Sequence, residues 1–367
     1  MLQQMNNQWD ALGENSLIPS ASHTRLWLAP MFEHFRKSHA HLVFDHDSKP
    51  LQAITALKKV TLPVGFSLPI AQTWDNGFLF SGIPLIGRNN PEKAMTSLLA
   101  NARQDMGVKA VLFKKIQRNS QFDQLLEGLS ADIIAGYQLL NVHQRASLDC
   151  SGDFDTWFTN NFSRKRRKEY RRLRNRLAET GKLQSQTLQP GASVEPWIEE
   201  FIDLEAAGWK GRNGTAIASS TEQTAHLRHA LPQMAQNGSL LFWKITLDDK
   251  PIASLFGFHD HNQVWLGKIA YDETLAHFSP GVLVILDATT DLFARDDVTI
   301  ADSSADPDHP MINNIWRDRI DVADYMIATP GTGKMTFKVL VTLEEARMKL
   351  RNLVKSAYYR LRKGSKK

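Results

Sequence analysis

Residues 240–259 read Leu-Leu-Phe-Trp-Lys-Ile-Thr-Leu-Asp-Asp-Lys-Pro-Ile-Ala-Ser-Leu-Phe-Gly-Phe-His, and this stretch decides the fold. Two apolar runs surround Asp248-Asp249-Lys250-Pro251, in which aspartate favours a tight bend and proline enters the returning strand. The stretch therefore predicts a β-hairpin. The same pattern occurs near the N-terminus, where apolar segments at His41–Phe44 and up to about Val60 surround Asp47-Ser48-Lys49-Pro50.

The segments around the two hairpins repeat as well. Each hairpin is preceded by an amphipathic helix and followed by a third strand, a helix with proline in its first turn, and a fourth strand. In the first unit these are expected at Leu26–Phe35, Gly77–Ser81, Pro91–Met106 and Ala110–Phe113, and in the second at Trp197–Leu204, Gln263–Ala270, Pro280–Ala294 and Val298–Ala301. The shared order predicts an internal duplication.

The duplication divides the chain into units. We expect the first over residues 1–150, the second over 151–330 with a last strand near Val322–Ile327, and a linker with a basic helix over 331–367. Thr342–Glu345 has the pattern of a capping box at the start of that helix. Its expected apolar stripe consists of Leu343, Ala346, Leu350, Val354, Ala357 and Leu361. The fold class is α/β, with mixed, mostly antiparallel sheets flanked by helices.

The composition is typical of a soluble globular protein, because 42% of the 367 residues are hydrophobic and 23% are charged. The single cysteine, Cys150, excludes an intrachain disulfide and fits a reducing compartment. The N-terminus lacks the pattern of a signal peptide, and no apolar run reaches the ~18 residues of a membrane span. We therefore expect a cytoplasmic protein.

Positive charge is concentrated in two segments. The formal net charge is +5, yet residues 333–367 hold eleven Lys and Arg against two Glu, and Arg164–Arg176 holds nine against Glu169. Local basic segments predict anionic partners at those segments. For the C-terminal helix we expect an anionic membrane surface, which would place the protein at the inner membrane face. Packing of its apolar stripe on the protein's own body is the alternative.

Three segments carry a family resemblance: Phe162-Ser-Arg-Lys-Arg-Arg-Lys-Glu-Tyr-Arg-Arg-Leu173, Leu204-Glu-Ala-Ala-Gly-Trp-Lys-Gly211, and Tyr271-Asp272 with Phe278-Ser-Pro-Gly281. Together they resemble the GNAT acetyltransferases. More narrowly, they resemble the FemAB-like branch, which includes acetyltransferases associated with cellulose and exopolysaccharide synthesis. The resemblance is strongest over residues 155–290. It implies two tandem GNAT-like folds and an acyl-CoA donor, with the working site in the second unit.

The segment Phe278-Ser279-Pro280-Gly281-Val282 lies between an expected strand and helix, where a GNAT phosphate loop would lie. Backbone N–H groups at a helix start attract an anion. Gly281 would let the backbone approach the phosphates, and Pro280 takes a position whose N–H is not needed. The usual Gln or Arg of this loop is replaced here by His277 or Phe278. An ordinary helix start is the alternative.

Three cations are further candidates for holding the cofactor. Arg164 and Arg167 stand in the first turn of a helix, where the helix dipole disfavours cations, so an anionic partner would explain them. Coenzyme A phosphates, an anionic lipid surface and transfer RNA all fit, and a solvated helix face is the alternative. Lys268 lies on the strand before the phosphate loop.

Acyl transfer to an amine also needs a base and a proton for the leaving thiolate. Asp302 closes the fourth strand of the second unit and would orient or deprotonate the amine, with a turn aspartate as the alternative. Lys210 lies in a glycine-rich segment that would line the acceptor pocket, and Glu205 is a second candidate base. The resemblance implies a tyrosine after this strand, which is absent. His309 or Tyr271 would replace it.

The expected function is transfer of an acetyl or longer acyl group from coenzyme A to an amine or hydroxyl on a sugar or small metabolite. Two alternatives stay open. One is a FemAB-like transferase that uses aminoacyl-tRNA, and the other is a non-catalytic GNAT module that binds a partner or membrane. No metal is expected, because Asp306, Asp308 and His309 in one proline-broken loop are weak evidence for a metal site.

Overall fold

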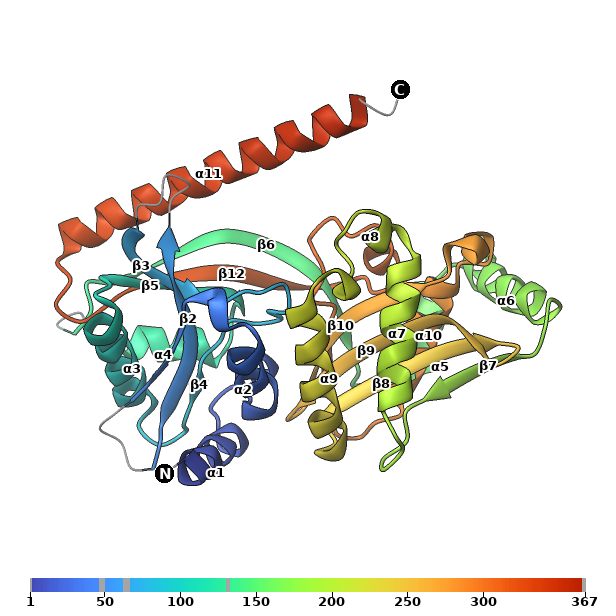
Figure 1. Cartoon of the computed structure of the whole chain (residues 1–367), viewed down its shortest axis with the longest axis horizontal. Coiled ribbons are helices and arrows are strands. Elements are labelled where there is room, and N and C mark those ends of the chain that lie inside the picture. The colour runs from blue at the N-terminus through green and yellow to red at the C-terminus, as the bar shows by residue number, and fades with distance from the viewer. Residues whose placement is uncertain (1, 46–49, 62–66, 130–132, 365–367) are drawn as a thin grey trace.

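The computed structural model describes residues 2–45, 50–61, 67–129 and 133–364 (Figure 1). Within these residues one mixed, mostly antiparallel sheet runs through the whole molecule in the order β1-β2-β3-β5-β12-β6-β11-β10-β9-β8-β7, and β4 pairs with β2. The strands are β1 Ala40–Phe44, β2 Ala53–Thr61, β3 Ser67–Thr73, β4 Leu85–Ile86, β5 Ala110–Gln117, β6 Tyr137–Asp149, β7 Leu183–Thr187, β8 Leu240–Leu247, β9 Lys250–Asp260, β10 Gln263–Tyr271, β11 Ile300–Asp302 and β12 Asp318–Ala328.

Helices cover the sheet (Figure 1). They are α1 Leu2–Glu14, α2 Arg25–His34, α3 Pro91–Met106, α4 Gln121–Gly128, α5 Phe154–Asn161, α6 Arg164–Ala178, α7 Glu195–Ala207, α8 Trp209–Arg212, α9 Thr221–Gln236, α10 Pro280–Phe293 and α11 Lys334–Gly364. A short 3-10 helix, η4, spans Glu273–Phe278. The expected α/β class with a mostly antiparallel sheet is thus confirmed.

The decisive hairpin forms as predicted, with β8 antiparallel to β9. Asp248 and Asp249 both have positive φ, 50° and 63°, which the tight two-residue turn requires. In the first half β1 pairs antiparallel with β2. Its predicted turn at residues 46–49 lies outside the described residues.

The two halves also share a crossover. Helices α3 and α10 each begin with proline after a left-handed residue, Asn90 with φ 54° and Ser279 with φ 55°. Each crossover returns to a parallel strand, so that β3 pairs with β5 and β10 pairs with β11. The prediction that both crossover helices begin with proline, at Pro91 and Pro280, is therefore confirmed, and the two helix starts have the same local conformation.

Three expectations about the strands and helices are corrected. Gly77–Ser81 is not a strand, because the third strand of the first half is β3. The helix directly before the β8–β9 hairpin is α9, which the sequence did not reveal. Helix α11 begins at Lys334, so Thr342 is an interior residue and its hydroxyl donates to the carbonyl of Lys338.

The strand near the end of the chain takes an unexpected place. β12 lies between β5 and β6 in the first half of the sheet, and not beside the strands of the second half. β6 pairs with β12 over most of its length and with β11 at its last residues, Ser147–Asp149. Figure 1 shows β6 and β12 as two long strands that join the halves.

The halves also share a hydrophobic core. Trp27 of α2 packs against Phe258 of β9, with ring centroids 4.7 Å apart, and its carbonyl lies 3.0 Å from Nε2 of His226 on α9. Both rings are buried. The relative position of the halves is therefore fixed by packing as well as by the sheet.

Helix α11 packs on the first half through Phe337 and Leu340, which are buried against β5 and β12 residues such as Leu112 and Met326. Within the described part of the chain, no helix has the length and apolar character needed to cross a bilayer.

Candidate active site

Strands β10 and β11 separate in the second half of the sheet. They pair in parallel only where residues Gln263–Trp265 of β10 lie beside Ile300–Asp302 of β11. Just beyond, β10 carries a bulge, where Gly267 and Lys268 together stand opposite Phe256 of β9. A pocket of about 190 Å³ opens at this divergence. Its polar lining comes from Lys210, Lys268, Ser303, Ser304 and His309.

A buried carboxylate organises one wall of this pocket. Glu205 on α7 is 2% exposed, and its Oε1 accepts a hydrogen bond from Nζ of Lys210 at 2.7 Å. The same oxygen lies 3.7 Å from Nζ of Lys268, while Oε2 accepts from the backbone N–H of Ile217 at 2.8 Å. Both oxygens are therefore engaged, and two ammonium groups face one carboxylate.

The ammonium groups differ in their surroundings. Nζ of Lys210 also donates to the carbonyl of Ile269 at 3.2 Å. Nζ of Lys268 lies 5.0 Å from the ring centroid of Phe78, a residue of the first half. Burial lowers the pKa of Lys268, and the nearby Lys210 lowers it further, while Glu205 opposes the shift. The wall thus carries positive charge that is poorly solvated.

His309 lies in the segment after β11 and lines the same pocket. Burial lowers the pKa of this imidazole, so the neutral form is favoured near neutral pH. Its Nδ1 accepts a hydrogen bond from the backbone N–H of Ile312 at 3.3 Å. The neutral ring therefore carries its proton on Nε2 and is suited to donate a hydrogen bond there.

Asp302 at the end of β11 is buried in an ion pair with Arg145 of β6. Its Oδ1 also accepts from the backbone N–H of Ser304 at 2.9 Å. Asp302 adjoins Ser303 of the pocket lining, but it does not line the pocket itself. Its use as a base stays a prediction, and the ion pair gives it a clear structural role.

The predicted phosphate loop forms the start of α10. No side chain caps this end, and no acidic residue stands in the first turn. Pro280 has no N–H, and the N–H groups of Val282 and Leu283 donate to the carbonyl of Ser279 at 2.9 and 3.2 Å, so the N–H of Gly281 and the helix dipole are what this end offers an anion. A Cβ on Gly281 would lie 2.9 Å from Cδ1 of Tyr271 and 3.3 Å from Sδ of Met311. Gly281 therefore lets the helix begin against Tyr271, a packing role that the sequence did not indicate.

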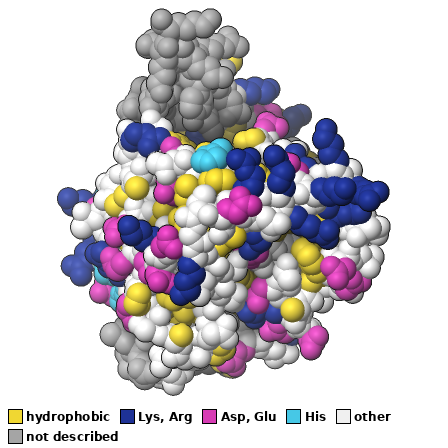
Figure 2. Space-filling model, turned by 90° about the vertical axis from the view of Figure 1, so that its right-hand side faces the viewer, with side chains coloured by type: hydrophobic (Ala, Val, Ile, Leu, Met, Phe, Trp, Pro, Cys, Tyr) yellow, Lys and Arg dark blue, Asp and Glu magenta, His cyan; other side chains and the backbone are white. Residues whose placement is uncertain are grey.

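The basic helix α6 packs against η4, the segment that leads into Ser279. The two α6 arginines that were predicted to hold the cofactor, Arg164 and Arg167, differ in their contacts. Arg167 donates from Nη1 to the carbonyls of Thr159 and Phe162, at 2.6 and 2.9 Å, and so stabilises the end of α5. Arg164 is exposed and has no ion pair with the described residues. Figure 2 shows the α6 end of the molecule, where Lys and Arg side chains gather.

The structure thus brings most of the predicted residues together. Lys210 and His309 line the pocket at the divergence, and an adjoining small pocket is lined by Glu205, Lys210 and Tyr271. Sequence reasoning missed Arg145, the partner of Asp302. No signal in the sequence pointed to it, because Arg145 stands among polar neighbours in His143-Gln144-Arg145-Ala146-Ser147 and looks like an ordinary exposed strand residue.

The equivalent divergence in the first half is filled. Beyond the parallel pairing of β3 with β5, the backbone N–H of Gly82 donates to the carbonyl of Lys114 at 2.7 Å. A Cβ on Gly82 would lie 2.4 Å from that carbonyl oxygen, so only glycine fits there. The segment around Gly82 closes this place, whereas the equivalent position of the second half opens into the pocket of about 190 Å³.

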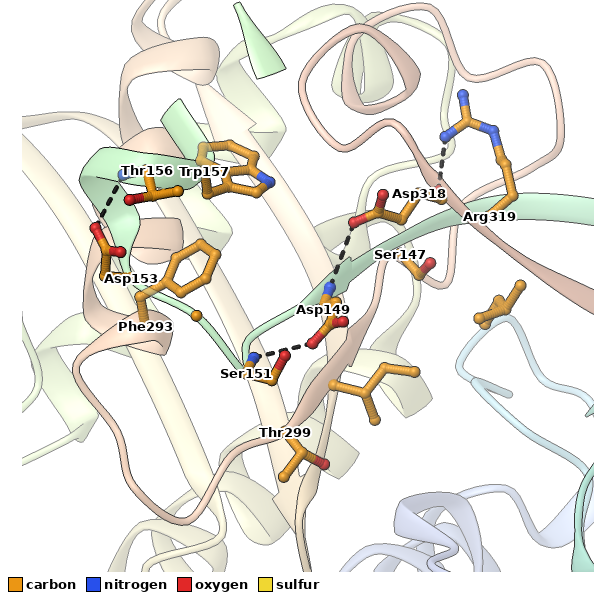
Figure 3. Close-up of a pocket in the computed structure, with 13 residues that line it drawn as sticks. Ser147, Asp149, Ser151, Asp153, Thr156, Trp157, Phe293, Thr299, Asp318 and Arg319 are labelled. Carbon is orange, nitrogen blue, oxygen red and sulfur yellow. Dashed lines mark hydrogen bonds between the residues drawn. The ribbon is translucent and has the colours of Figure 1, made fainter. Parts of the chain in front are cut away.

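A larger pocket, of about 600 Å³, lies at the other end of β11 (Figure 3). Trp157 and Phe293 form its apolar side, and none of the predicted site residues lines it. Its carboxylates are engaged in local turns, because Asp149 accepts from the N–H of Ser151 and Asp153 from that of Thr156. We therefore place the candidate site at the divergence of β10 and β11.

Comparison with known proteins finds a family model that matches this region. Residues 164–306 match the family model described as an acetyltransferase (GNAT) domain. A search of curated protein sequences finds no match. Among solved structures, the chain is similar to a conserved protein of unknown function from Bacteroides thetaiotaomicron VPI-5482, with a TM-score of 0.55 and 14% identity over 90% of this chain and 97% of that chain.

Two other structures are similar over nearly the whole chain. One is the C-terminal domain of a putative lysylphosphatidylglycerol synthetase from Agrobacterium fabrum, with a TM-score of 0.56 and 10% identity over 95% of this chain and 96% of that chain. The other is FemX, with a TM-score of 0.52 and 12% identity over 93% of this chain and 98% of that chain. The segment that matches the GNAT acetyltransferase domain contains Glu205, Lys210, Lys268 and Asp302, and it ends before His309.

Proposed function

We propose that the protein is an acyltransferase that uses acyl-CoA, acetyl-CoA first, and acylates an amine or hydroxyl on a sugar or small metabolite. The observation that carries this proposal is the open pocket between β10 and β11, with Lys210, Lys268 and His309 around it, most of whose lining lies in the GNAT-matching segment. The sequence resemblance to polysaccharide-associated acetyltransferases makes a sugar acceptor the first choice.

The start of α10 and the exposed cations of α6 would hold the phosphates of the coenzyme. The N–H of Gly281 and the positive end of the α10 dipole lie beside η4, against which α6 packs, so both attractions act on the same side of the pocket. Arg164 fits this role better than Arg167, whose guanidinium is already engaged. Bound there, acyl-CoA supplies an acyl group activated as a thioester.

The residues of the pocket then stabilise the charge that develops during transfer. Lys210 and Lys268 place positive charge where the acyl oxygen becomes negative, in a poorly solvated wall where such charge is most effective. The Nε2–H of His309 donates a hydrogen bond into the same space. Glu205 holds both lysines in position, and its charge opposes the lowering of the Lys268 pKa.

The test combines binding and turnover. Acyl-CoA should raise the melting temperature by mass action, and an assay of free thiol release should report transfer to a panel of amino sugars and sugars. Lys268→Ala should lower the transfer rate by about 10²–10³ while coenzyme binding persists. Lys250→Ala, exposed in the β8–β9 turn, is the matched control. Absence of any acyl-CoA binding would overturn the proposal.

An aminoacyl-tRNA donor is the second candidate, because five exposed cations of α6 have no hydrogen bond or ion pair with the described residues. They are Arg164, Lys165, Lys168, Arg171 and Arg176. A steep fall of tRNA affinity with salt would support this donor. A non-catalytic binding module is the remaining alternative, and retained acyl-CoA binding with turnover would exclude it.

We also propose that α11 docks the protein on an anionic membrane surface. The described residues of the stripe face solvent and do not pack on the body, since Leu343, Leu350 and Val354 are 45%, 58% and 62% exposed. Ala357 and Leu361 lie among residues whose side chains are not described. The stripe is flanked by cations such as Lys349 and Arg351, which complement acidic lipid headgroups.

A second copy of α11 is the competing occupant of this stripe, but it would bring like charges together. Sedimentation with vesicles distinguishes the two. We expect binding to phosphatidylglycerol vesicles and not to pure phosphatidylcholine, with loss of binding in Leu350→Ser/Leu353→Ser. A concentration-dependent dimer that the same variant abolishes, without vesicle binding, would overturn membrane docking.

A further inference from the structure

A group of two histidines and one glutamate lies where the two halves meet, away from the pocket between β10 and β11. Glu33 and His34 form the end of α2, and His229 lies on α9, which packs against α2. Nε2 of His34 is 3.0 Å from Nδ1 of His229, and that nitrogen is 3.6 Å from Oε2 of Glu33. One ligand atom from each residue falls within 4.8 Å of the others.

These separations fit a tetrahedral metal ion. With Zn–N bonds of about 2.0–2.1 Å and tetrahedral angles, two ligand atoms on one zinc stand about 3.3 Å apart. The two measured separations, 3.0 and 3.6 Å, lie on either side of that value. The third separation, between the ligand atoms of Glu33 and His34, is within 4.8 Å, so a rotation of the exposed Glu33 side chain would complete the set around one ion.

The donor set and its exposure also suit zinc. Two imidazole nitrogens and one carboxylate oxygen are a common set of protein ligands for Zn²⁺, with water as the fourth. The side chains of His229 and Glu33 are 37% and 54% exposed, so an ion can enter and a water can complete the site. The residues come from two helices held together by the buried contacts of Trp27 and His226, so the group is partly preorganised.

We infer that Glu33, His34 and His229 bind one Zn²⁺ ion and that this ion fastens α2 of the first half to α9 of the second. A direct hydrogen bond between the two imidazoles is the competing explanation of the 3.0 Å contact. The metal site needs all three side chains, whereas the hydrogen bond needs only the two histidines. The site is structural, since it lies outside the lining of the pocket at the divergence.

The experiment uses the full chain, freed of tags and treated with chelator. Titration with Zn²⁺ by calorimetry should give one site per chain, and Co²⁺ should give the visible absorption of a tetrahedral complex. Zn²⁺ should also raise the melting temperature. His34→Ala, His229→Ala and Glu33→Ala should each weaken Zn²⁺ binding by more than about 10-fold, because each removes a ligand. His41→Ala, an exposed histidine on β1, is the matched control.

Two results would overturn the inference. One is Zn²⁺ binding in His229→Ala that equals that of the starting protein, which would place the ion elsewhere. The other is the absence of a tetrahedral Co²⁺ spectrum in the folded, unmodified chain, which would leave only the hydrogen-bonded histidine pair. Circular dichroism of each variant checks that it is folded, and Glu33→Ala, at an exposed helix end, keeps the test valid if a histidine variant fails to fold.

Discussion

Gly281 and Tyr271 are in direct contact across the start of α10: a Cβ at position 281 would stand 2.9 Å from Cδ1 of Tyr271. The missing side chain therefore points toward a neighbouring ring of the protein. A substitution at Gly281 acts on the position of Tyr271 as well as on the helix start where we expect the coenzyme phosphates.

Gly281→Val should abolish acyl-CoA binding, and Gly281→Ala should weaken it, because each added side chain displaces Tyr271 and the first turn of α10. Overpacking of this kind costs about 1–3 kcal/mol of unfolding free energy. Calorimetric titration with acetyl-CoA measures the binding loss. Gly281→Ala combined with Tyr271→Ala relieves the contact and should recover much of the affinity. Normal binding by Gly281→Val would remove this helix start from the site.

Glu205→Gln should lower the free energy of unfolding by about 3 kcal/mol, because it leaves Lys210 and the largely buried Lys268 without their counter-charge. Urea unfolding measures the change. Glu199→Gln provides the matched control on the same helix, since its ion pair with Arg228 is exposed and should contribute less than about 1 kcal/mol. Similar losses in both variants would contradict a special role for the buried carboxylate.

Asp302→Asn should lower the transfer rate far more than it lowers coenzyme affinity if Asp302 acts on the acceptor, by roughly 10²–10⁴. The same change leaves Arg145 buried without its partner, which destabilises the fold. The double variant Asp302→Asn/Arg145→Met removes both charges and separates the two effects. Steady-state rates should stay low in the double variant. Recovery of the rate together with stability would make Asp302 a purely structural residue.

The stability of the protein should fall as the pH drops below about 6.5. Burial lowers the pKa of His23 to about 3 and that of His226 to about 4, so the unfolded chain binds protons that the folded chain does not. As the pH falls from the pKa of the unfolded chain to that of the folded chain, each histidine lowers the free energy of unfolding by up to about 1.4 kcal/mol per pH unit. Urea unfolding at pH 7.5, 6 and 5 measures the slope. His226→Gln should make it shallower, and an unchanged slope would contradict this account.

Local signals in the sequence predicted the parts of the fold that depend on neighbouring residues. The turn at Asp248-Asp249 and the helix starts at Pro91 and Pro280 follow from backbone preferences alone, and all three form. Gly77–Ser81 has the apolar content of a strand, yet it fills the space beside Lys114, which depends on contacts with distant strands. Helix α9 was missed although Leu227, Leu231 and Met234, which it buries, stand at helical spacing, so here the local signal was present.

The candidate site was predictable as a set of residues, but not as an arrangement. Lys210, Glu205 and His309 were identified from their segments, and the structure places them around adjoining pockets. The pairing of Asp302 with Arg145 joins residues 157 positions apart, and the approach of Lys268 to Phe78 joins the two halves. No local pattern records such contacts, because they arise only when the sheet is assembled.

The place of β12 has a consequence for how this chain matures during synthesis. β5 and β6 leave a gap between them that residues 318–328 fill, so the first half keeps two unpaired strand edges until the second half, with β7 to β11, has been made. The halves therefore cannot mature one after the other on the ribosome, and a nascent chain stalled before β12 would be a target for chaperones. Synthesis of residues 318–328 becomes the checkpoint for both halves at once.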